Sequence, residues 1–399
     1  MRLAIIISPP IQYYAPWFHF MAASGQLDLK VFYLWDGGAN SGLDAGFSIN
    51  VQWDIPLLEG YTHEFVPNRS RNAGTGRVFG LNNPALAGRV AAFKPDAVLL
   101  FGYNYMSLYR FLLSPLARKT PLLFRGDSHR LVPRPGLKQV LRKRWIRAVF
   151  SRFSAFLYVG QANRAYFSLH GVPDRKLFFC PHCVDNERFF SETRCARQAA
   201  VEWKKELGIE PSRRVVLYAG KFEAKKMPGD LIQAFKRAAL KNTALVLVGD
   251  GKLGPDLRKS VSGDSNIVFA PFQNQTQMPR AYALADLFVL PSYGSEETWG
   301  LSVNEALCMG CPVIVSDHVG CARDLVQPFR NGLVFPAGDI AALANVLREA
   351  FSDPGRLRAW GAHGRDIVKN YSYQQATRGL IAGLGSVAGT ARAIKRPER

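Results

Sequence analysis

The 399-residue sequence contains no stretch of 18 uncharged apolar residues, and it therefore predicts no transmembrane helix. It also lacks low-complexity tracts and any block with the composition of a disordered chain. The opening "MRLAIIISPP" has one basic residue and an apolar run that two prolines end, which is typical of a first strand and not of a signal peptide. These absences predict a globular cytoplasmic protein of two or three domains.

Cysteine is scarce, with six residues in the chain, and without an export signal we expect the thiols to be reduced. Two C-x-x-C pairs, Cys180 with Cys183 and Cys308 with Cys311, have a spacing found in redox disulfides and in halves of zinc sites. The pairs lie far apart in the chain, whereas structural zinc sites usually join their halves over short spans. We therefore disfavour zinc, and a redox role for Cys180 and Cys183 would require exposed thiols of lowered pKa.

Acidic residues are missing from position 128 to position 173, while the whole chain carries a net charge of +20. Such a charge indicates an acidic partner: nucleic acid, an anionic membrane surface or a phosphorylated small molecule. In the segment 130–152, basic and apolar residues alternate at nearly helical spacing, as in "LKQVLRKRWIRAVF". This pattern predicts either a basic helix that lies on anionic lipid or a solvated helix face over an ordinary core, and both interpretations stay open.

Short apolar runs alternate with helix-like stretches along the whole chain. The runs are "RLAIIIS", "LKVFYLW", "DAVLLFG", "PLLFRG" and "AFLYVG" in the first half, and "RVVLYAG", "TALVLVGDG", "NIVFA", "LFVLPS", "PVIVSD" and "GLVF" in the second. This alternation predicts an α/β protein with two Rossmann-like, doubly wound parallel-sheet domains in tandem. We expect an N-terminal domain at 1–190, a polar joint at 191–206, a C-terminal domain at 207–371, and a helix at about 372–390 that packs back on the first domain. Ligands of such sheets bind beyond the carboxyl ends of the strands, so we expect the site in the cleft between the domains.

A cluster of lysines directly follows the predicted strand that ends at Gly220. Lys221, Lys225 and Lys226 come before Pro228, an expected helix start, and cations beside a helix N-terminus suit a diphosphate. The sequence has neither G-x-x-x-x-G-K-[ST] nor a well-placed G-x-G-x-x-G. A P-loop ATPase, a kinase and a dinucleotide dehydrogenase are therefore disfavoured.

Two glutamates, Glu297 and Glu305, follow the run "LFVLPS". We expect a helix to begin near Trp299 or Gly300 and to carry Glu305 in its second turn, so that its free amides can bind a phosphate. Glu297 can then accept hydrogen bonds from sugar hydroxyls, and Glu305 from two vicinal hydroxyls such as those of a ribose. Acidic residues also stabilise helix starts through the helix dipole, so these glutamates could be surface residues with no ligand to bind. The apolar neighbours of Glu305 nevertheless indicate partial burial, where a carboxylate needs a partner.

The segment "EETWGLSVNEAL", with seven residues between Glu297 and Glu305, resembles the E-x7-E signature of the retaining glycosyltransferases of family 4, which have the GT-B fold. The segment "YAGKFEAKK" resembles the family's G-R-x4-K stretch, with Lys221 in the arginine position and Lys226 in the lysine position. Further matches in the right order are "GVPDRKLFFCPHCVDNERF", "VGDGKLGPDL", "PRAYALADLFVLPS" and "GLVFPAGD". The resemblance thus extends over nearly the whole chain.

The resemblance implies a retaining, metal-independent transferase that moves a sugar from a UDP- or GDP-linked donor to a glycan or lipid-linked acceptor, in the synthesis of a cell-surface polysaccharide or glycolipid. It implies that Lys221 and Lys226 hold the donor's diphosphate, Glu297 the sugar and Glu305 the ribose. The other implied donor-binding residues are Gly220, Phe272, Gln273, Thr298, Trp299, Gly300 and Leu301, of which Phe272 and Gln273 lie where the base is read. No D-x-D motif is present, so we expect no metal and no other cofactor, with lysines and a helix dipole stabilising the departing diphosphate.

Two loops depart from the family's pattern. "SPPIQYYAPW" stands where members often have a Gly-Gly turn, so the contacts of this loop stay open. "PLLFRGDSHR" stands where many members have a histidine near the sugar. Counting without gaps puts Asp127 in that position, so we predict Asp127 as the active-site residue and keep His129 as the alternative. His182 is expected at the cleft-side end of a strand, where members often have an asparagine.

Other functions stay open beside this one. The segment 130–152 suggests an enzyme that binds the inner membrane face as a peripheral protein. The same scaffold could also serve a sugar phosphorylase or an epimerase. A basic nucleic-acid-binding protein is a different class, but no helix-turn-helix, zinc-finger or RNA-recognition signature supports it, so we expect no nucleic-acid partner.

Overall fold

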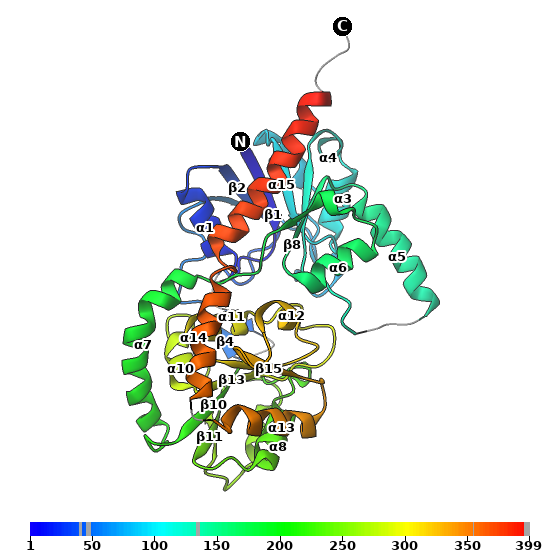
Figure 1. Ribbon diagram of the computed structural model, residues 1–399. Coiled ribbons are helices and arrows are strands. Elements are labelled where there is room, and N and C mark those ends of the chain that lie inside the picture. Colours follow the sequence, from blue (N-terminus) through cyan, green and yellow to red (C-terminus); the bar gives the residue numbers. More distant parts are fainter. Residues whose placement is uncertain (40–41, 45–48, 133–135, 354, 395–399) are drawn as a thin grey trace.

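The computed structural model describes residues 1–39, 42–44, 49–132, 136–353 and 355–394 of the chain. Figure 1 shows two α/β domains, one above the other, each with a parallel sheet among helices. The N-terminus lies in the upper domain, and the last helix of the chain returns to that domain. The predicted fold class, two facing Rossmann-like domains, is thereby confirmed.

The first domain is built on a seven-stranded sheet in the order β5-β2-β1-β6-β7-β8-β9, with all neighbours parallel. Its central strands are runs of Ile, Leu, Val and Phe that are almost fully buried, as is typical of strands covered on both faces. The strands are β1 (Arg2–Ile7), β2 (Asp28–Tyr33), β5 (Thr62–Phe65), β6 (Ala97–Phe101), β7 (Leu122–Arg125), β8 (Ala155–Tyr158) and β9 (Leu177–Phe179). An antiparallel pair, β3 (Gly42–Asp44) with β4 (Ile49–Val51), lies outside this sheet.

The helices of the first domain connect its strands. They are α1 (Ala15–Ala23), α2 (Leu86–Ala92), α3 (Met106–Leu113), α4 (Pro115–Lys119), α5 (Leu137–Phe150) and α6 (Gln161–Leu169), with short 3-10 turns at η1 (Val78–Gly80) and η2 (Asp174–Lys176). Helix α5 covers most of the basic segment 130–152, whose residues 133–135 lie outside the described part of the chain.

The second domain is built on a six-stranded parallel sheet in the order β12-β11-β10-β13-β14-β15. The strands are β10 (Arg214–Ala219), β11 (Thr243–Val248), β12 (Ile267–Ala270), β13 (Leu287–Leu290), β14 (Val313–Ser316) and β15 (Gly332–Phe335). The helices are α8 (Pro228–Ala238), α9 (Gly254–Ser260), α10 (Met278–Leu284), α11 (Leu301–Cys308), α12 (Ala322–Leu325), α13 (Ile340–Phe351) and α14 (Arg356–Val368), with a 3-10 turn at η3 (Ala224–Lys226).

Helix α7 (Asn186–Glu206) carries the chain from the first domain to the second. The Asp185 carboxylate caps it by accepting a hydrogen bond of 3.1 Å from the amide of Arg188. Phe189, Ala200 and Trp203 of this helix are buried in a core shared with the second sheet. The segment 191–206, which we expected to be a polar joint, is therefore helical and packs on α10 and α11. The domain limits 1–190 and 207–371 stay a prediction.

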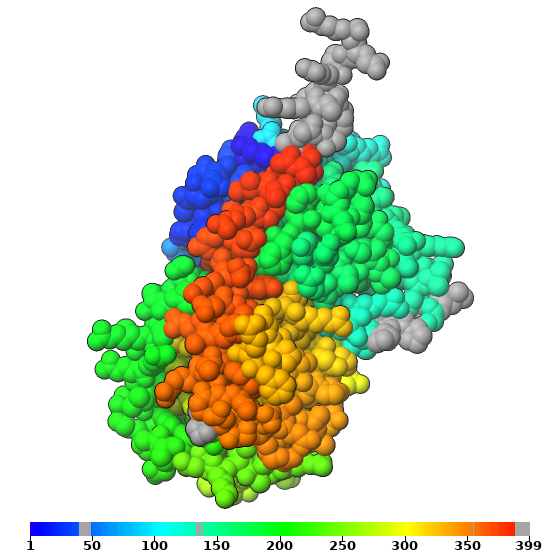
Figure 2. All heavy atoms as spheres, viewed as in Figure 1, coloured from blue at the N-terminus to red at the C-terminus, as the bar shows by residue number. Residues whose placement is uncertain are grey.

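Helix α15 (Tyr373–Ile394) lies against β8 and β9 of the first sheet. In Figure 2 it forms the red ridge that runs from the second domain over the first. The indole Nε1 of Trp17 donates a hydrogen bond of 3.0 Å to the hydroxyl of Thr377. A Cβ atom at Gly379 would lie 1.8 Å from the carbonyl oxygen of Phe179, so only glycine permits this close packing.

Every apolar run named in the sequence contains a strand of one of the two sheets. The sequence did not indicate β5 or the β3–β4 pair, because these strands have only three or four residues each. The strand expected before His182 is β9. Among the helices of the described residues, none combines the length and the apolar character that a bilayer crossing requires.

Candidate active site

Residues that follow strands of both sheets meet between the two domains. The turn after β7 supplies Asp127 and His129, and the turn after β9 supplies His182. All three contact the segment Glu297–Asn304, which follows β13. These contacts join residues more than 100 positions apart and put the carboxyl ends of both sheets at one cleft.

Glu297 and Lys226 form an ion pair in this cleft. The side chain of Glu297 is 11% exposed, and the same carboxylate oxygen accepts a hydrogen bond of 2.8 Å from the hydroxyl of Ser292. Lys226 ends the turn η3, and helix α8 begins two residues later at Pro228, as the sequence predicted. The lysine and the glutamate are thus fixed beside each other by two strand ends, those of β10 and β13.

The strand β10 ends directly before Gly220 and Lys221. The amide of Gly220 donates a hydrogen bond of 3.0 Å to the carbonyl of Val248, and the hydroxyl of Tyr218 donates one of 2.7 Å to the carbonyl of Lys221. These bonds fix the backbone of the turn that carries the lysines. Lys225 points to a different pair of carboxylates, those of Glu223 and Glu296 at 3.5 and 3.4 Å.

Glu305 is 3% exposed and lies in the second turn of α11, as expected from the sequence. Its Oε2 accepts a hydrogen bond of 2.7 Å from the hydroxyl of Tyr282, whereas its Oε1 has no hydrogen-bond partner among the described residues. Burial raises the pKa of Glu305 to about 7, against the smaller opposing effects of Tyr282 and of the Arg188 charge. A buried carboxylate oxygen without a donor is costly, so Oε1 of Glu305 has room for one further hydrogen bond.

Asp127 bridges the two domains. Its Oδ2 accepts a hydrogen bond of 2.7 Å from the hydroxyl of Thr298 and lies 3.6 Å from Nε2 of His182. Burial by itself raises the pKa of Asp127, but the hydrogen bond and charge of His182, together with Thr298, outweigh it and hold the pKa at about 2. Asp127 is therefore ionised at neutral pH.

His129 is tied to backbone groups through both ring nitrogens. Its Nε2 lies 3.2 Å from the carbonyl oxygen of Glu297, and its Nδ1 accepts a hydrogen bond of 3.3 Å from the amide of Leu131. Burial lowers the pKa of His129, which favours the neutral ring that these two contacts require. The histidine thus fixes the backbone of the Glu297 loop.

Trp299 and Gly300 shape the start of α11. The Trp299 side chain is buried beside His182 and donates a hydrogen bond of 2.8 Å from Nε1 to Oδ1 of Asn304, so its indole is part of the core. Gly300 has a positive φ of 99°, and a Cβ there would lie 2.9 Å from the side chain of Leu290. Leu301 is the first residue of the helix.

Phe272 and Gln273 lie in the loop after β12, where we expect the base. The side-chain amide of Gln273 donates to the carbonyls of Pro271 and Phe272 at 3.0 and 3.2 Å, and its oxygen accepts a bond of 2.8 Å from Arg280. The polar atoms of Gln273 are therefore engaged by the loop itself and by Arg280 of α10. The Phe272 ring lies 6.4 Å from the ring of Trp53, which belongs to the first domain.

Several residues of the cleft escaped the sequence reasoning. Asn304 donates a hydrogen bond of 3.3 Å to the carbonyl of His182 across the domains. Tyr13 of the first loop packs against the core that includes Val303 and Ala306 of α11, and its pKa is raised by burial and by the charge of Glu305. The paired tyrosines of "QYYAPW" were the only hint, because contacts between distant segments leave no local pattern.

The C-x-x-C pairs are buried. Cys180, Cys183, Cys308 and Cys311 are buried free thiols, and burial raises the pKa of each. A redox role would need the opposite, exposure and a lowered pKa. Within the described residues, no group of three or more His, Cys, Asp and Glu side chains is arranged to hold a metal ion.

Two Rossmann-like domains whose strand ends meet at a cleft form the arrangement of the GT-B fold. Residues 200–367 match the family model described as "Glycosyl transferases group 1". This part of the chain thus matches a glycosyltransferase family model, as its motifs predicted. The finer assignment by the E-x7-E signature stays a prediction.

Solved structures share the fold over nearly the full chain. HepE of Anabaena, in complex with UDP and glucose, has a TM-score of 0.71 and 17% identity over 97% of this chain and 100% of that one. A glycosyltransferase from Rickettsia africae has a TM-score of 0.73 and 13% identity over 97% and 98% of the two chains. At these identities the likeness concerns the fold alone.

Curated relatives match shorter parts. The D-inositol 3-phosphate glycosyltransferase of Nocardia farcinica is 26% identical over 277 residues, which are 66% of this chain and 58% of the relative. A GDP-mannose-dependent monoacylated alpha-(1-6)-phosphatidylinositol monomannoside mannosyltransferase of Corynebacterium glutamicum is 29% identical over 243 residues, 59% of this chain and 61% of the relative. The chain spans about half the length of the curated relatives it matches.

Proposed function

We propose that this protein is a retaining glycosyltransferase that moves a sugar from a nucleoside-diphosphate sugar to a glycan or lipid-linked acceptor. The observation that carries the proposal is the buried Glu305 carboxylate, whose Oε1 has no hydrogen-bond partner among the described residues. Two vicinal hydroxyls of a ribose are donors of the right kind for such an oxygen. The Lys226–Glu297 pair lies in the same cleft and offers a cation for a diphosphate and a carboxylate for a sugar.

Each residue has a defined task in this reaction. Lys221 and Lys226 hold the diphosphate, and the amides at the start of α11, near Gly300 and Leu301, add donors to its oxygens. Glu297 accepts hydrogen bonds from hydroxyls of the donor sugar. The acceptor hydroxyl attacks the anomeric carbon on the face from which the diphosphate leaves, the bond from that carbon to the phosphate oxygen breaks, and the departing phosphate takes the acceptor's proton. No protein nucleophile is required, and the two glutamates are not the acid and base of a hydrolase.

The lysines and the α11 amides supply the positive charge that other transferases take from a metal ion. We propose that the reaction needs no metal and no other cofactor. Turnover should then be unchanged by a chelator of divalent ions.

In this proposal the donor is a UDP-sugar or a GDP-sugar. HepE is described in complex with UDP and with UDP-glucose, and the Corynebacterium glutamicum relative is named as GDP-mannose-dependent. Both types of donor therefore belong in the first screen. The acceptor belongs to the synthesis of a cell-surface polysaccharide or glycolipid.

We propose that the protein acts at the cytoplasmic surface of a membrane. Helix α5 exposes Val140, Leu141 and Trp145 by 49%, 63% and 53%, and basic residues surround them on the same helix. Figure 1 shows α5 on the outer side of the first domain. Exposed apolar side chains among cations fit an anionic lipid surface, where the helix would lie in the interface.

A donor screen tests the enzymatic proposal. Thermal unfolding and donor hydrolysis are measured with UDP- and GDP-sugars for the wild type, Glu297→Ala and the matched control Glu296→Ala, whose carboxylate is 68% exposed. We expect one donor to raise the unfolding temperature of all three proteins and to be turned over by all except Glu297→Ala. The proposal fails if no nucleoside-diphosphate sugar or nucleoside diphosphate stabilises the wild type. Labelled products would also separate transfer from phosphorolysis and from epimerisation.

A further inference from the structure

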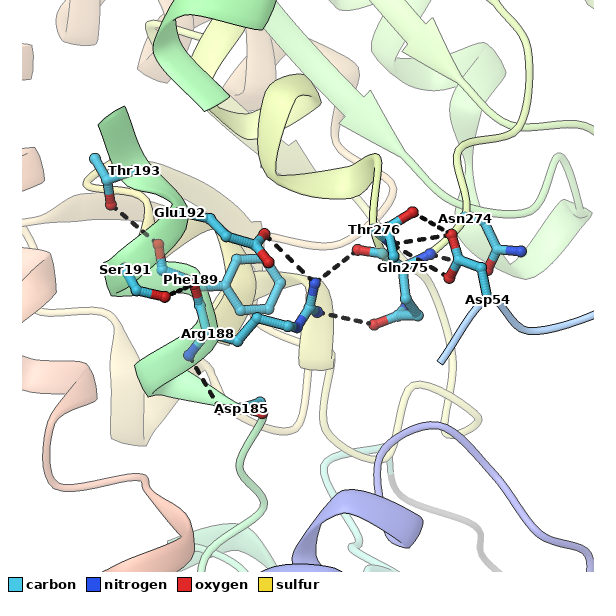
Figure 3. Close-up of polar contacts among 10 residues, drawn as sticks. All are labelled: Asp54, Asp185, Arg188, Phe189, Ser191, Glu192, Thr193, Asn274, Gln275 and Thr276. Atoms are coloured by element: carbon cyan, nitrogen blue, oxygen red, sulfur yellow. Dashed lines mark hydrogen bonds and ion pairs between the residues drawn. The ribbon is translucent and has the colours of Figure 1, made fainter. Parts of the chain in front are cut away.

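A short segment of the first domain, Gln52–Asp54, lies against the loop of the second domain in which we expect the donor base. The side-chain amide of Asn274 donates a hydrogen bond of 2.6 Å to the carbonyl of Gln52. The backbone amide of Thr276 lies 3.2 Å from both carboxylate oxygens of Asp54, and the Thr276 hydroxyl donates to the same carboxylate. Figure 3 shows the Asp54 side chain turned toward Asn274 and Thr276. Each pair of residues is 222 positions apart.

The same loop is held from its other side by helix α7. Arg188 donates a hydrogen bond of 2.8 Å to the carbonyl of Gln275 and lies 3.4 Å from the side-chain oxygen of that residue. Its guanidinium also lies 3.7 Å from the carboxylate of Glu192. Figure 3 shows Gln275 and Thr276 between Arg188 on one side and Asp54 on the other. The loop is thus held by Asp54 of the first domain on one side and by helix α7 on the other.

The aromatic residues of the two segments also meet. The Trp53 and Phe272 rings are 6.4 Å apart and inclined by 61°, and both side chains are half-buried. The polar atoms of Gln273, by contrast, are engaged with Arg280 and with the loop's own carbonyls. The aromatic surfaces that a base could contact here therefore come from Phe272 and Trp53, whose rings meet edge to face.

We propose that Trp53 and Phe272 together form the aromatic wall against which the base of the donor packs, and that the hydrogen bonds that Thr276 donates to Asp54 hold Trp53 in place. The first domain thereby contributes a residue to base binding. This inference rests on the proposed function, because it assigns the base end of that donor. It also couples donor binding to the approach of the two domains, since the wall exists only when Gln52–Asp54 lies against the loop.

Affinity measurements with and without a base test this proposal. Dissociation constants for UDP, GDP and inorganic diphosphate are measured by calorimetry for the wild type, Trp53→Ala and Trp53→Phe. We expect Trp53→Ala to weaken the better-bound nucleotide about tenfold, the range that a lost base–aromatic contact predicts, and Trp53→Phe to recover part of this loss. The affinity for inorganic diphosphate, which has no base, should not change.

Two further variants keep the test decisive. Phe79→Ala removes an aromatic side chain that is 69% exposed elsewhere in the first domain, and it should bind nucleotides like the wild type. Asp54→Ala removes an exposed carboxylate, so this variant should fold even where Trp53→Ala folds poorly. It should weaken the binding of nucleotides and leave the affinity for inorganic diphosphate unchanged. Equal nucleotide affinities of the wild type, Trp53→Ala and Asp54→Ala would overturn the inference alone. A wild type that binds neither UDP nor GDP would overturn the proposed function with it.

Discussion

The ammonium group of Lys226 and the carboxylate of Glu297 are ion-paired in the cleft, although the proposed donor needs both of them for different groups. Glu297 keeps a second partner in Ser292, whereas Lys226 can turn toward a diphosphate. The pair therefore holds the lysine in place until a donor arrives. It also keeps the carboxylate, which is 11% exposed, from being buried without a compensating charge.

The first prediction concerns Lys226→Ala. Loss of the ammonium removes a charge-assisted contact to the diphosphate and leaves Glu297 to repel the donor, so the affinity for a nucleoside diphosphate should fall roughly 10- to 100-fold. The matched control is Lys225→Ala, since Lys225 is 42% exposed and pairs with Glu223 and Glu296. That change should alter the affinity less than about threefold. Similar losses in the two variants, measured by calorimetry, would contradict the assignment.

The second prediction concerns the titration of Glu305. In an unfolded chain this group has a pKa of 4.5, and burial raises the pKa in the folded protein to about 7. Between these values the folded protein binds more protons than the unfolded chain, so stability falls as the pH rises and stays low above pH 7. The difference amounts to about 3 kcal/mol. Glu305→Gln should therefore gain stability over the wild type as the pH is raised from about 5 to about 8.

Donor binding should show the opposite trend for the same group. Ribose hydroxyls that donate to the carboxylate favour its ionised form, so the wild type should bind a nucleotide sugar more tightly at about pH 8 than at about pH 6. The Gln variant should lose this pH dependence. Denaturant unfolding and calorimetry of both proteins over the pH range check the two trends. Parallel stability profiles of wild type and variant would show that Glu305 titrates normally.

The third prediction concerns the packing of α15. Gly379→Ala places a methyl group about where the Phe179 carbonyl oxygen is, since a Cβ would lie 1.8 Å from that oxygen. The helix must then move away from β9, and the free energy of unfolding should fall by several kcal/mol, roughly 3 or more. Gly385→Ala in the same helix is the control, because no atom lies within 4 Å of its Cβ position. Its higher helix propensity should stabilise the protein by up to about 1 kcal/mol.

The fourth prediction concerns the membrane surface of α5. A double variant, Leu141→Ser with Trp145→Ser, should bind liposomes of anionic lipid at least roughly tenfold more weakly than the wild type, because two exposed apolar side chains no longer enter the interface. Val201→Ser, which changes a residue of α7 that is 56% exposed, should bind normally. Sedimentation with liposomes at low and high salt measures both effects, and binding of the wild type should weaken as salt rises. Lipid binding that the double variant retains in full would place the membrane contact elsewhere.

Local pattern was sufficient for much of the fold. The apolar runs predicted the main strands of both sheets, Pro228 marked the start of α8, and the start of α11 was expected one or two residues from Leu301. The placement of Lys226 and Glu305 after strands followed from the same pattern. These features could be predicted because hydrophobic periodicity and helix starts depend on neighbouring residues.

Contacts between distant segments required the folded chain. The bridge from Asp127 to Thr298 and His182, the Trp53–Phe272 pair and the contact of α15 with β9 all join residues far apart in sequence, and no local pattern encodes them. The polar segment 191–206 looked like a joint because its apolar residues are few, yet α7 packs on α10 and buries Ala196, Ala200 and Trp203. Burial also decided the chemistry, since Glu305 and the buried thiols have raised pKa values that depend on what surrounds them. Sequence thus specified the strands and the residue types at their ends, whereas tertiary packing decided which of those residues meet and in which state of charge.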